Sequence, residues 1–124
     1  MSARPGTVYL APNGSQMGVT SDGRIRLGQE PAENGFCPSA SYLFESVAKA
    51  YGPFAMGILL TGMGRDGATG LRRLREAGGI TIAQDEESSV IFGMPGEAIK
   101  LGGAEFVLPP EEISWQIRSR VIQK

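Results

Sequence analysis

The sequence AMGILLTGMGRDGATGLRRLREAGG, residues 55–79, decides the fold. It opens with an apolar run over 55–60, whose length is typical of a fully buried strand. A glycine-rich turn over 61–67 follows and carries a single carboxylate, Asp66. Apolar residues then recur at helical spacing from Ala68 to Leu74, and a pair of glycines predicts the end of the helix. A strand, a tight loop and a helix in this order place the loop at the carboxyl end of a strand, where open α/β sheets carry their chemistry.

Strand-like and helix-like segments alternate along the rest of the chain. The predicted strands are 7–11, 17–20, 24–27, 80–83 and 105–108, and the predicted helices are 39–51, 86–89, 95–101 and 109–121. Asp22 and Gly23 separate two short alternating runs, which predicts a tight antiparallel hairpin. Strand alternating with helix in the second half predicts right-handed crossovers between parallel strands. The fold class is therefore α/β, with a mostly parallel, doubly wound, Rossmann-like sheet and a small antiparallel hairpin.

The composition is that of one small folded domain. The chain has 124 residues, 41% of them hydrophobic, and a formal net charge of −1. It can build one core, and it lacks the basic footprint of a nucleic-acid binder. The single cysteine, Cys37, excludes an intrachain disulfide and a cysteine-based zinc cluster. No apolar run reaches the length of a membrane span and no signal peptide is recognisable, so we expect a cytoplasmic protein without membrane insertion.

The sequence contains no histidine. This removes the usual general base, the commonest metal ligand and any Ser-His-Asp relay built within these residues alone. We therefore expect neither a metal nor a cofactor.

Residues 62–67 fit the pattern G-x-G-x-x-G between a strand and a helix, and Asp85 follows at the end of the next predicted strand. Taken literally, this is a dinucleotide-binding fingerprint. Asp66 weakens that interpretation, because it would put a negative charge beside the helix N-terminus that should receive a pyrophosphate. A nucleotide-binding module is therefore the least favoured alternative.

The position of Asp66 alone allows two interpretations. As the acid of a hydrolase, its carboxylate would orient a histidine and stabilise the imidazolium. As an N-cap, it would accept hydrogen bonds at the start of its own helix. The arginines at 72, 73 and 75 are most simply the solvated side of that helix, with a patch that binds an acidic partner as the alternative.

Residues 59–109, LLTGMGRDGATGLRRLREAGGITIAQDEESSVIFGMPGEAIKLGGAEFVLP, closely resemble the catalytic domain of the chemotaxis protein-glutamate methylesterases, the CheB family. VYLAPNG at 8–14 resembles the strand and turn of that family, and PSASYLFESVA at 38–48 resembles its PSVDxLFxSVA helix. The agreement runs in order through nearly the whole chain. It covers the C-terminal part of the family's catalytic domain.

The resemblance implies a doubly wound α/β domain that hydrolyses glutamate methyl esters on chemoreceptors and releases methanol. Members of the family use a Ser-His-Asp triad, and some also deamidate receptor glutamine. Asp66 falls on the triad aspartate. Met63 falls on a methionine associated with the oxyanion region, and Gly62 and Gly64 flank it along the site. The candidates for a loop on the substrate side are Thr61, Met94 and Pro95.

The chain departs from the family pattern by what it lacks. The family's nucleophilic serine and triad histidine lie upstream of the position that matches Thr7, and residues 15–17 stand where relatives often have a histidine-containing turn. The N-terminal receiver domain is missing as well. We therefore expect residues 1–124 to form a single CheB-type domain, truncated at its N-terminal side and catalytically incomplete.

Loss of the first strand–helix units would expose a sheet edge and apolar surface, and such edges invite pairing. We expect a homodimer or a complementing chain that brings the serine and the histidine. The resemblance implies a chemoreceptor or another signalling protein as the partner. The alternative to a methylesterase is a non-catalytic binding homologue in a signalling pathway.

Overall fold

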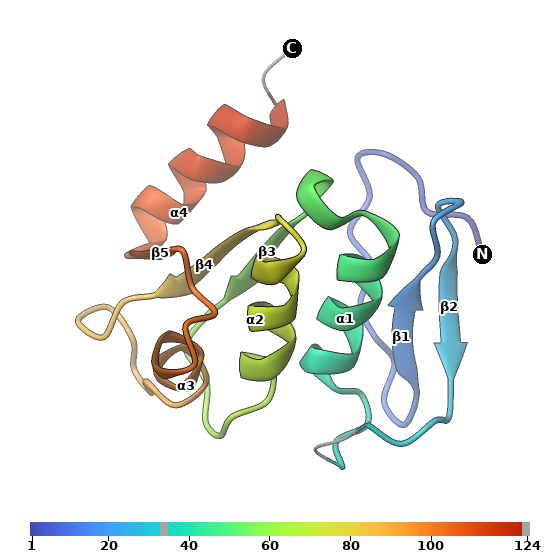
Figure 1. Ribbon diagram of the computed structural model, residues 1–124, viewed down its shortest axis with the longest axis horizontal. Coiled ribbons are helices and arrows are strands. Elements are labelled where there is room, and N and C mark those ends of the chain that lie inside the picture. The colour runs from blue at the N-terminus through green and yellow to red at the C-terminus, as the bar shows by residue number, and fades with distance from the viewer. Residues whose placement is uncertain (33–34, 123–124) are drawn as a thin grey trace.

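Short strands and helices alternate along the chain (Figure 1). The computed structural model describes residues 1–32 and 35–122. In order, the elements are β1 (Gln16–Val19), β2 (Ile25–Gly28), α1 (Ala40–Ala50), β3 (Met56–Leu59), α2 (Ala68–Glu76), β4 (Ile80–Gln84), α3 (Met94–Lys100), β5 (Phe106–Leu108) and α4 (Pro110–Ile117). A 3-10 turn, η1 (Gly52–Phe54), leads into β3, and a π-helical segment, η2 (Arg118–Ile122), follows α4.

The strands β3, β4 and β5 form a parallel sheet in that order. Met56 lies opposite Ile80 in the first pair, and Ile82 lies opposite Phe106 in the second. Parallel neighbours need a crossover connection, which α2 supplies between β3 and β4 and α3 supplies between β4 and β5. The predicted α/β class with a parallel sheet is confirmed.

The strands β1 and β2 form a separate antiparallel hairpin that lies beside α1 (Figure 1). Gly23 in the turn has a φ of 81°, a conformation that glycine adopts without steric cost. The backbone N–H of Val19 in β1 donates to Ser46 Oγ of α1 at 3.0 Å. The predicted hairpin is confirmed, and this bond joins it to the helix.

The core lies between the parallel sheet and α2. Leu71 and Leu74 are fully buried on α2, as the helical spacing of its apolar residues predicts, and Ile82 of β4 is fully buried with them. Leu59 at the end of β3 and Ala98 of α3 complete the contact between sheet and helices. The core therefore fixes the end of β3 and the start of α2, which flank the glycine-rich loop.

The helices α1 and α2 approach each other closely at a glycine. A Cβ atom at Gly70 would lie 2.6 Å from Ser41 Cα and 2.9 Å from Phe44 Cβ. Any larger residue at position 70 would push the two helices apart, and overpacking of this kind is destabilising. The glycine thus lets the first turns of α1 and α2 lie side by side, and that contact builds the site described below.

The predicted strand 7–11 is wrong. The structure has no regular element there, and Val8 and Leu10 are 88% and 87% exposed. A strand is stabilised by hydrogen bonds to a neighbouring strand. No strand within residues 1–32 and 35–122 pairs with this segment, so its alternating apolar pattern is not sufficient to form one.

The predicted short helix 86–89 is also wrong, because Glu86–Ser88 form a turn. Asp85 Oδ1 accepts the backbone N–H of Ser88 at 3.1 Å, and Ser89 N donates to Glu86 O at 3.1 Å. An aspartate that bonds the backbone ahead of it offers an alternative to helical bonds.

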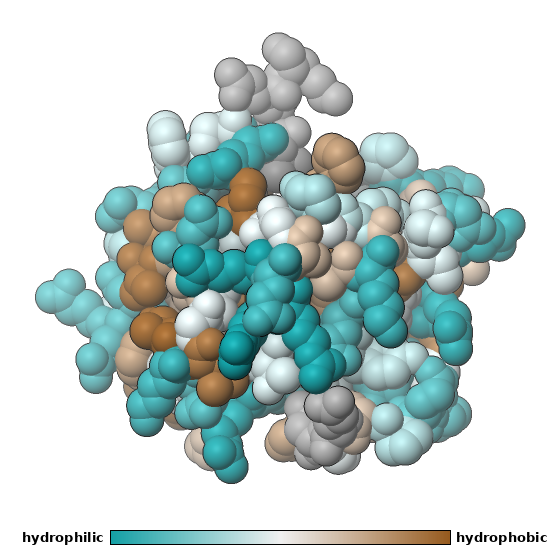
Figure 2. Space-filling model, viewed as in Figure 1, coloured by the Kyte–Doolittle hydropathy of each residue, from teal (hydrophilic) through white to brown (hydrophobic). Residues whose placement is uncertain are grey.

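The face seen in Figure 2 is hydrophilic over α1 and α2, and hydrophobic side chains gather on the side where α3 lies. This division agrees with α2, whose charged side chains point outward while its leucines are buried. In the described part of the chain, no helix has the length and apolarity that crossing a membrane requires.

Candidate functional site

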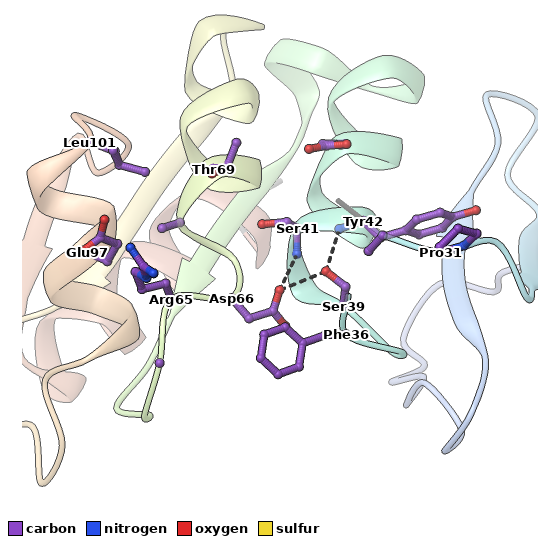
Figure 3. Close-up of a pocket in the computed structure, with 14 residues that line it drawn as sticks. Pro31, Phe36, Ser39, Ser41, Tyr42, Arg65, Asp66, Thr69, Glu97 and Leu101 are labelled. Atoms are coloured by element: carbon purple, nitrogen blue, oxygen red, sulfur yellow. Dashed lines mark hydrogen bonds between the residues drawn. The ribbon is translucent and has the colours of Figure 1, made fainter. Parts of the chain in front are cut away.

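A cavity of about 810 Å³ opens beside the glycine-rich loop, between the first turn of α1, the start of α2 and α3 (Figure 3). Three elements and one connecting segment line it. Its lining residues are Pro31, Ala32 and Phe36 before α1, Ser39, Ser41, Tyr42 and Glu45 at α1, Gly64, Arg65, Asp66, Ala68 and Thr69 around the start of α2, and Glu97 and Leu101 at α3. The cavity lies at the carboxyl edge of the parallel sheet, where the strand–loop–helix order predicts a site.

The carboxylate of Asp66 accepts three hydrogen bonds from the start of α1, and Figure 3 shows the two from Ser39 and Ser41. Ser39 Oγ donates to Oδ1 at 2.9 Å, the backbone N–H of Ala40 donates to Oδ2 at 2.8 Å, and that of Ser41 donates to Oδ1 at 3.3 Å. Backbone N–H groups at a helix start have no partner inside the helix, and the helix dipole favours a negative charge there. Asp66 is therefore held in one orientation at the wall of the cavity.

The hydroxyl of Ser41 serves α2 in return. Ser41 Oγ accepts the backbone N–H of Gly67 at 3.0 Å and that of Gly70 at 3.1 Å. Gly67 stands at the N-cap position of α2 with a φ of 92°, and no side chain of its own can cap the helix. Each helix start thus receives hydrogen-bond acceptors from the other, and α1 is also capped by its own Ser39, whose Oγ accepts the N–H of Tyr42 at 3.3 Å.

These contacts correct two expectations for the glycine-rich loop, namely the N-cap role of Asp66 for its own helix and the dinucleotide fingerprint. Asp66 is a cap, but it caps α1 and not its own helix. At the start of α2, the N–H groups of Gly67 and Gly70 donate to Ser41 and that of Ala68 donates to Arg65 O, so these three do not face a ligand as the dinucleotide fingerprint requires. The geometry therefore disfavours the nucleotide-binding alternative.

The residues before Gly64 are tied to the segment that precedes α3. The hydroxyl of Thr61 donates to Ile91 O at 2.9 Å and accepts the N–H of Ile91 at 2.9 Å. Gly62 N donates to Ile91 O at 3.0 Å, and Gly62 O accepts the N–H of Met94 at 2.9 Å. The structure thus brings the segment 61–62 and the start of α3 together, although neither Thr61 nor Gly62 lines the cavity.

The other predicted site residues lie at different depths. Gly64 lines the cavity, Met63 is 77% exposed at the tip of the loop, and Pro95 is buried in the first turn of α3. Of the residues predicted for the site, only Asp66 and Gly64 line this cavity.

Charged side chains surround the cavity. Arg65 lies on its α3 side together with Glu97 (Figure 3). On the opposite side, the Tyr42 hydroxyl donates to the Glu30 carboxylate, and Arg26 Nη2 lies 3.6 Å from Glu30 Oε1. The hydrogen bond from Tyr42 lowers the pKa of Glu30 below its usual range, and the same bond raises the pKa of Tyr42. The described residues contain no group of three metal-ligating side chains.

The arginines of α2 are engaged within the chain. Arg73 Nη1 lies 2.6 Å from Glu45 Oε2, Arg72 Nε lies 3.2 Å from Glu76 Oε2, and Arg75 donates to backbone carbonyls after α3. Exposed ion pairs of this kind belong to a solvated helix face. This arrangement gives no support to the alternative that the three arginines form a patch that binds an acidic partner.

Sequence reasoning missed how the site is held together. It did not predict that Ser39 and Ser41 bond the residues around the start of α2, and it gave no role to Arg65 or Gln16. One available signal was the pairing of a serine-rich helix start at 39–41 with an aspartate just before a second helix. That signal identifies a particular contact only when the fold is known to bring the two helix starts together.

The chain is similar to a known protein family over most of its length. A model of the CheB methylesterase family matches residues 1–117. A protein-glutamate methylesterase/protein-glutamine glutaminase of Syntrophus aciditrophicus is 57% identical over 111 residues, which are 90% of this chain and 32% of that protein. The protein-glutamate methylesterase FrzG of Myxococcus xanthus is 54% identical over 109 residues, 88% of this chain and 33% of that protein. The chain thus spans about a third of the length of these relatives.

A solved structure agrees with the fold. The CheB methylesterase catalytic domain of Thermotoga maritima superposes with a TM-score of 0.90 at 32% sequence identity. The match covers 98% of this chain and 66% of that one. The predicted Rossmann-like fold is confirmed.

Replacement of Asp66 by alanine is expected to destabilise the protein by about 2 kcal/mol, because three donors at the start of α1 lose an acceptor. Asp66→Asn keeps one acceptor oxygen and should cost less than half as much. Urea unfolding followed by far-UV circular dichroism measures both. Glu87→Ala, at an exposed acid outside the site, is the control, and an Asp66→Ala variant as stable as this control would contradict the capping role.

Proposed function

The chain belongs to the CheB methylesterase family, and from this membership we propose that it supplies the acid-bearing part of a protein-glutamate methylesterase. The substrate is a methyl ester of a glutamate side chain on a chemoreceptor, and the products are the free glutamate and methanol. The observation that carries the proposal is the Asp66 carboxylate, held in one orientation at the wall of an open cavity.

The proposed reaction is an acyl transfer to a serine hydroxyl. The serine oxygen attacks the ester carbonyl while its proton moves to an imidazole, and methanol leaves with that proton. Water then hydrolyses the acyl-enzyme by the same route and restores the serine. A carboxylate must orient the imidazole and stabilise its charged form, which is the role proposed for Asp66. The chain contains no histidine, so the imidazole comes from outside these 124 residues.

The other predicted site residues keep proposed roles around this acid. Met63 and Gly64 are proposed for the oxyanion side. Gly62 contributes shape, since its N–H already donates to Ile91 O. Thr61, Met94 and Pro95 are proposed to form the rim that faces the receptor. No cofactor takes part in the proposed reaction.

The serine and the histidine are proposed to come from a complementing chain that pairs with exposed surface. β3 is an edge strand of the parallel sheet in the described residues, and the segment before β1 exposes Val8 and Leu10. Open edges and exposed apolar side chains favour association. A homodimer through the same surface is the form proposed for the chain alone, and a cytoplasmic chemoreceptor or another signalling protein is the proposed partner.

Light scattering of the purified chain is expected to give a mass above 13.1 kDa, the mass of one copy, because an uncovered edge pairs with a second copy. A clean species of 13.1 kDa would contradict self-association. It would leave the complementing chain as the occupant of that surface.

Methanol release from a carboxyl-methylated chemoreceptor tests the proposed activity. The chain is mixed with the segment of the Syntrophus aciditrophicus relative that precedes the matched region. We expect hydrolysis in the mixture and none from either part alone. Asp66→Asn should lower kcat by about 10⁴-fold, as loss of the acid does in other Ser-His-Asp enzymes, while the exposed Glu87→Gln control should leave it unchanged.

Two results would contradict this proposal in different ways. A rate in the mixture that Asp66→Asn does not reduce would show that Asp66 is not the acid. Stable association of the two parts without any methanol would instead favour a non-catalytic binding homologue.

A further inference from the structure

One fully buried polar side chain has no role in the proposed reaction. Gln16 opens β1 in the hairpin, and none of its surface is exposed. Burying an amide costs free energy unless its hydrogen bonds are made. The groups that Gln16 bonds therefore indicate what it does.

The amide of Gln16 connects two points of the segment that leads into α1. Its Nε2 donates to Phe36 O at 2.8 Å, and its Oε1 accepts the backbone N–H of Ser39 at 2.9 Å. Only a side chain that donates and accepts at once can make both bonds. Gln16 thus fixes the backbone on either side of residues 37 and 38.

Both fixed points belong to the cavity that Asp66 lines, and one of them bonds its carboxylate. Ser39 is buried, and its Oγ donates to Asp66 Oδ1 at 2.9 Å. Phe36 lines the same cavity as Asp66 (Figure 3). A path of three residues, Gln16–Ser39–Asp66, therefore runs from the hairpin to the wall of the site.

We propose that Gln16 and Ser39 are positioning residues for Asp66. Gln16 holds the backbone of Ser39, and the Ser39 hydroxyl sets the orientation of the carboxylate toward the cavity. Both residues act through Asp66. This inference rests on the proposed function for its effect on catalysis, although the positioning itself can be measured without any reaction.

If Gln16 had a purely structural role, its loss would have the same effect as the loss of any other bond between the hairpin and α1. Ser46 supplies the comparison, because its Oγ accepts the N–H of Val19 in β1 at 3.0 Å. Ser46 also joins β1 to α1, but it has no hydrogen bond to Asp66 and does not line the cavity. Ser46→Ala is therefore a matched control for Gln16→Met.

The first test is kinetic and uses the reconstituted enzyme described above. Gln16→Met and Ser39→Ala are expected to lower kcat by about tenfold or more with KM unchanged, because small displacements of a catalytic group cost large factors in rate. Ser39→Thr keeps the hydroxyl and should restore most of kcat. Ser46→Ala should leave kcat within about twofold of the parent, even where its unfolding midpoint falls as far as that of Gln16→Met.

The second test needs no activity. The N–H of Ala40 donates to Asp66 Oδ2 at 2.8 Å, so its amide resonance and its hydrogen-exchange rate report the position of the carboxylate. Gln16→Met should shift this resonance and speed its exchange, and Ser46→Ala should change neither.

The possible failures are distinguishable. If the parent mixture releases no methanol, the proposed function fails and the Ala40 amide alone decides the positioning role. If Gln16→Met and Ser46→Ala affect Ala40 equally, or lower kcat equally, the positioning role is overturned. Should Gln16→Met not fold, Ser39→Ala and Ser39→Thr decide the question by the same two measurements.

Discussion

Asp66 accepts hydrogen bonds from the start of α1, and Ser41 of α1 accepts hydrogen bonds from the start of α2. Helix starts leave several N–H groups without intrahelical partners, and here each start accepts two of those groups from the other, while Ser39 caps α1 from within. The exchange requires the two first turns to touch, which Gly70 permits by having no side chain between α2 and Ser41. The cavity, the orientation of the acid and the packing of α1 on α2 all depend on this junction.

The same junction explains how one carboxylate can serve structure and chemistry together. A group that must orient an imidazole has to be rigid, and three donors from α1 make Asp66 rigid before any partner binds. The hairpin extends this support, since the buried amide of Gln16 holds the backbone of Ser39. The small antiparallel sheet is therefore part of the construction of the site, although it contributes no side chain to the cavity itself.

The sequence allowed the strand, loop and helix of 55–79 to be predicted, because periodicity and glycine positions act locally. It also placed Asp66 at a carboxyl edge, where the structure has it. Which helix Asp66 caps could not be predicted, because Ser39 lies 27 residues away along the chain. The strand predicted at 7–11 failed since pairing is not a local property, and Gln16 was overlooked since a polar residue beside an alternating run suggests a solvated position.

The two helix starts stabilise each other through one shared junction. A double-mutant cycle with Asp66→Ala and Ser41→Ala, measured by urea unfolding, tests it most directly. Substitutions within one hydrogen-bond network have non-additive effects on the free energy of unfolding. We therefore predict a coupling free energy of about 1 kcal/mol between the two substitutions. Effects that add to within about 0.4 kcal/mol would contradict the account, because they would mean two independent caps.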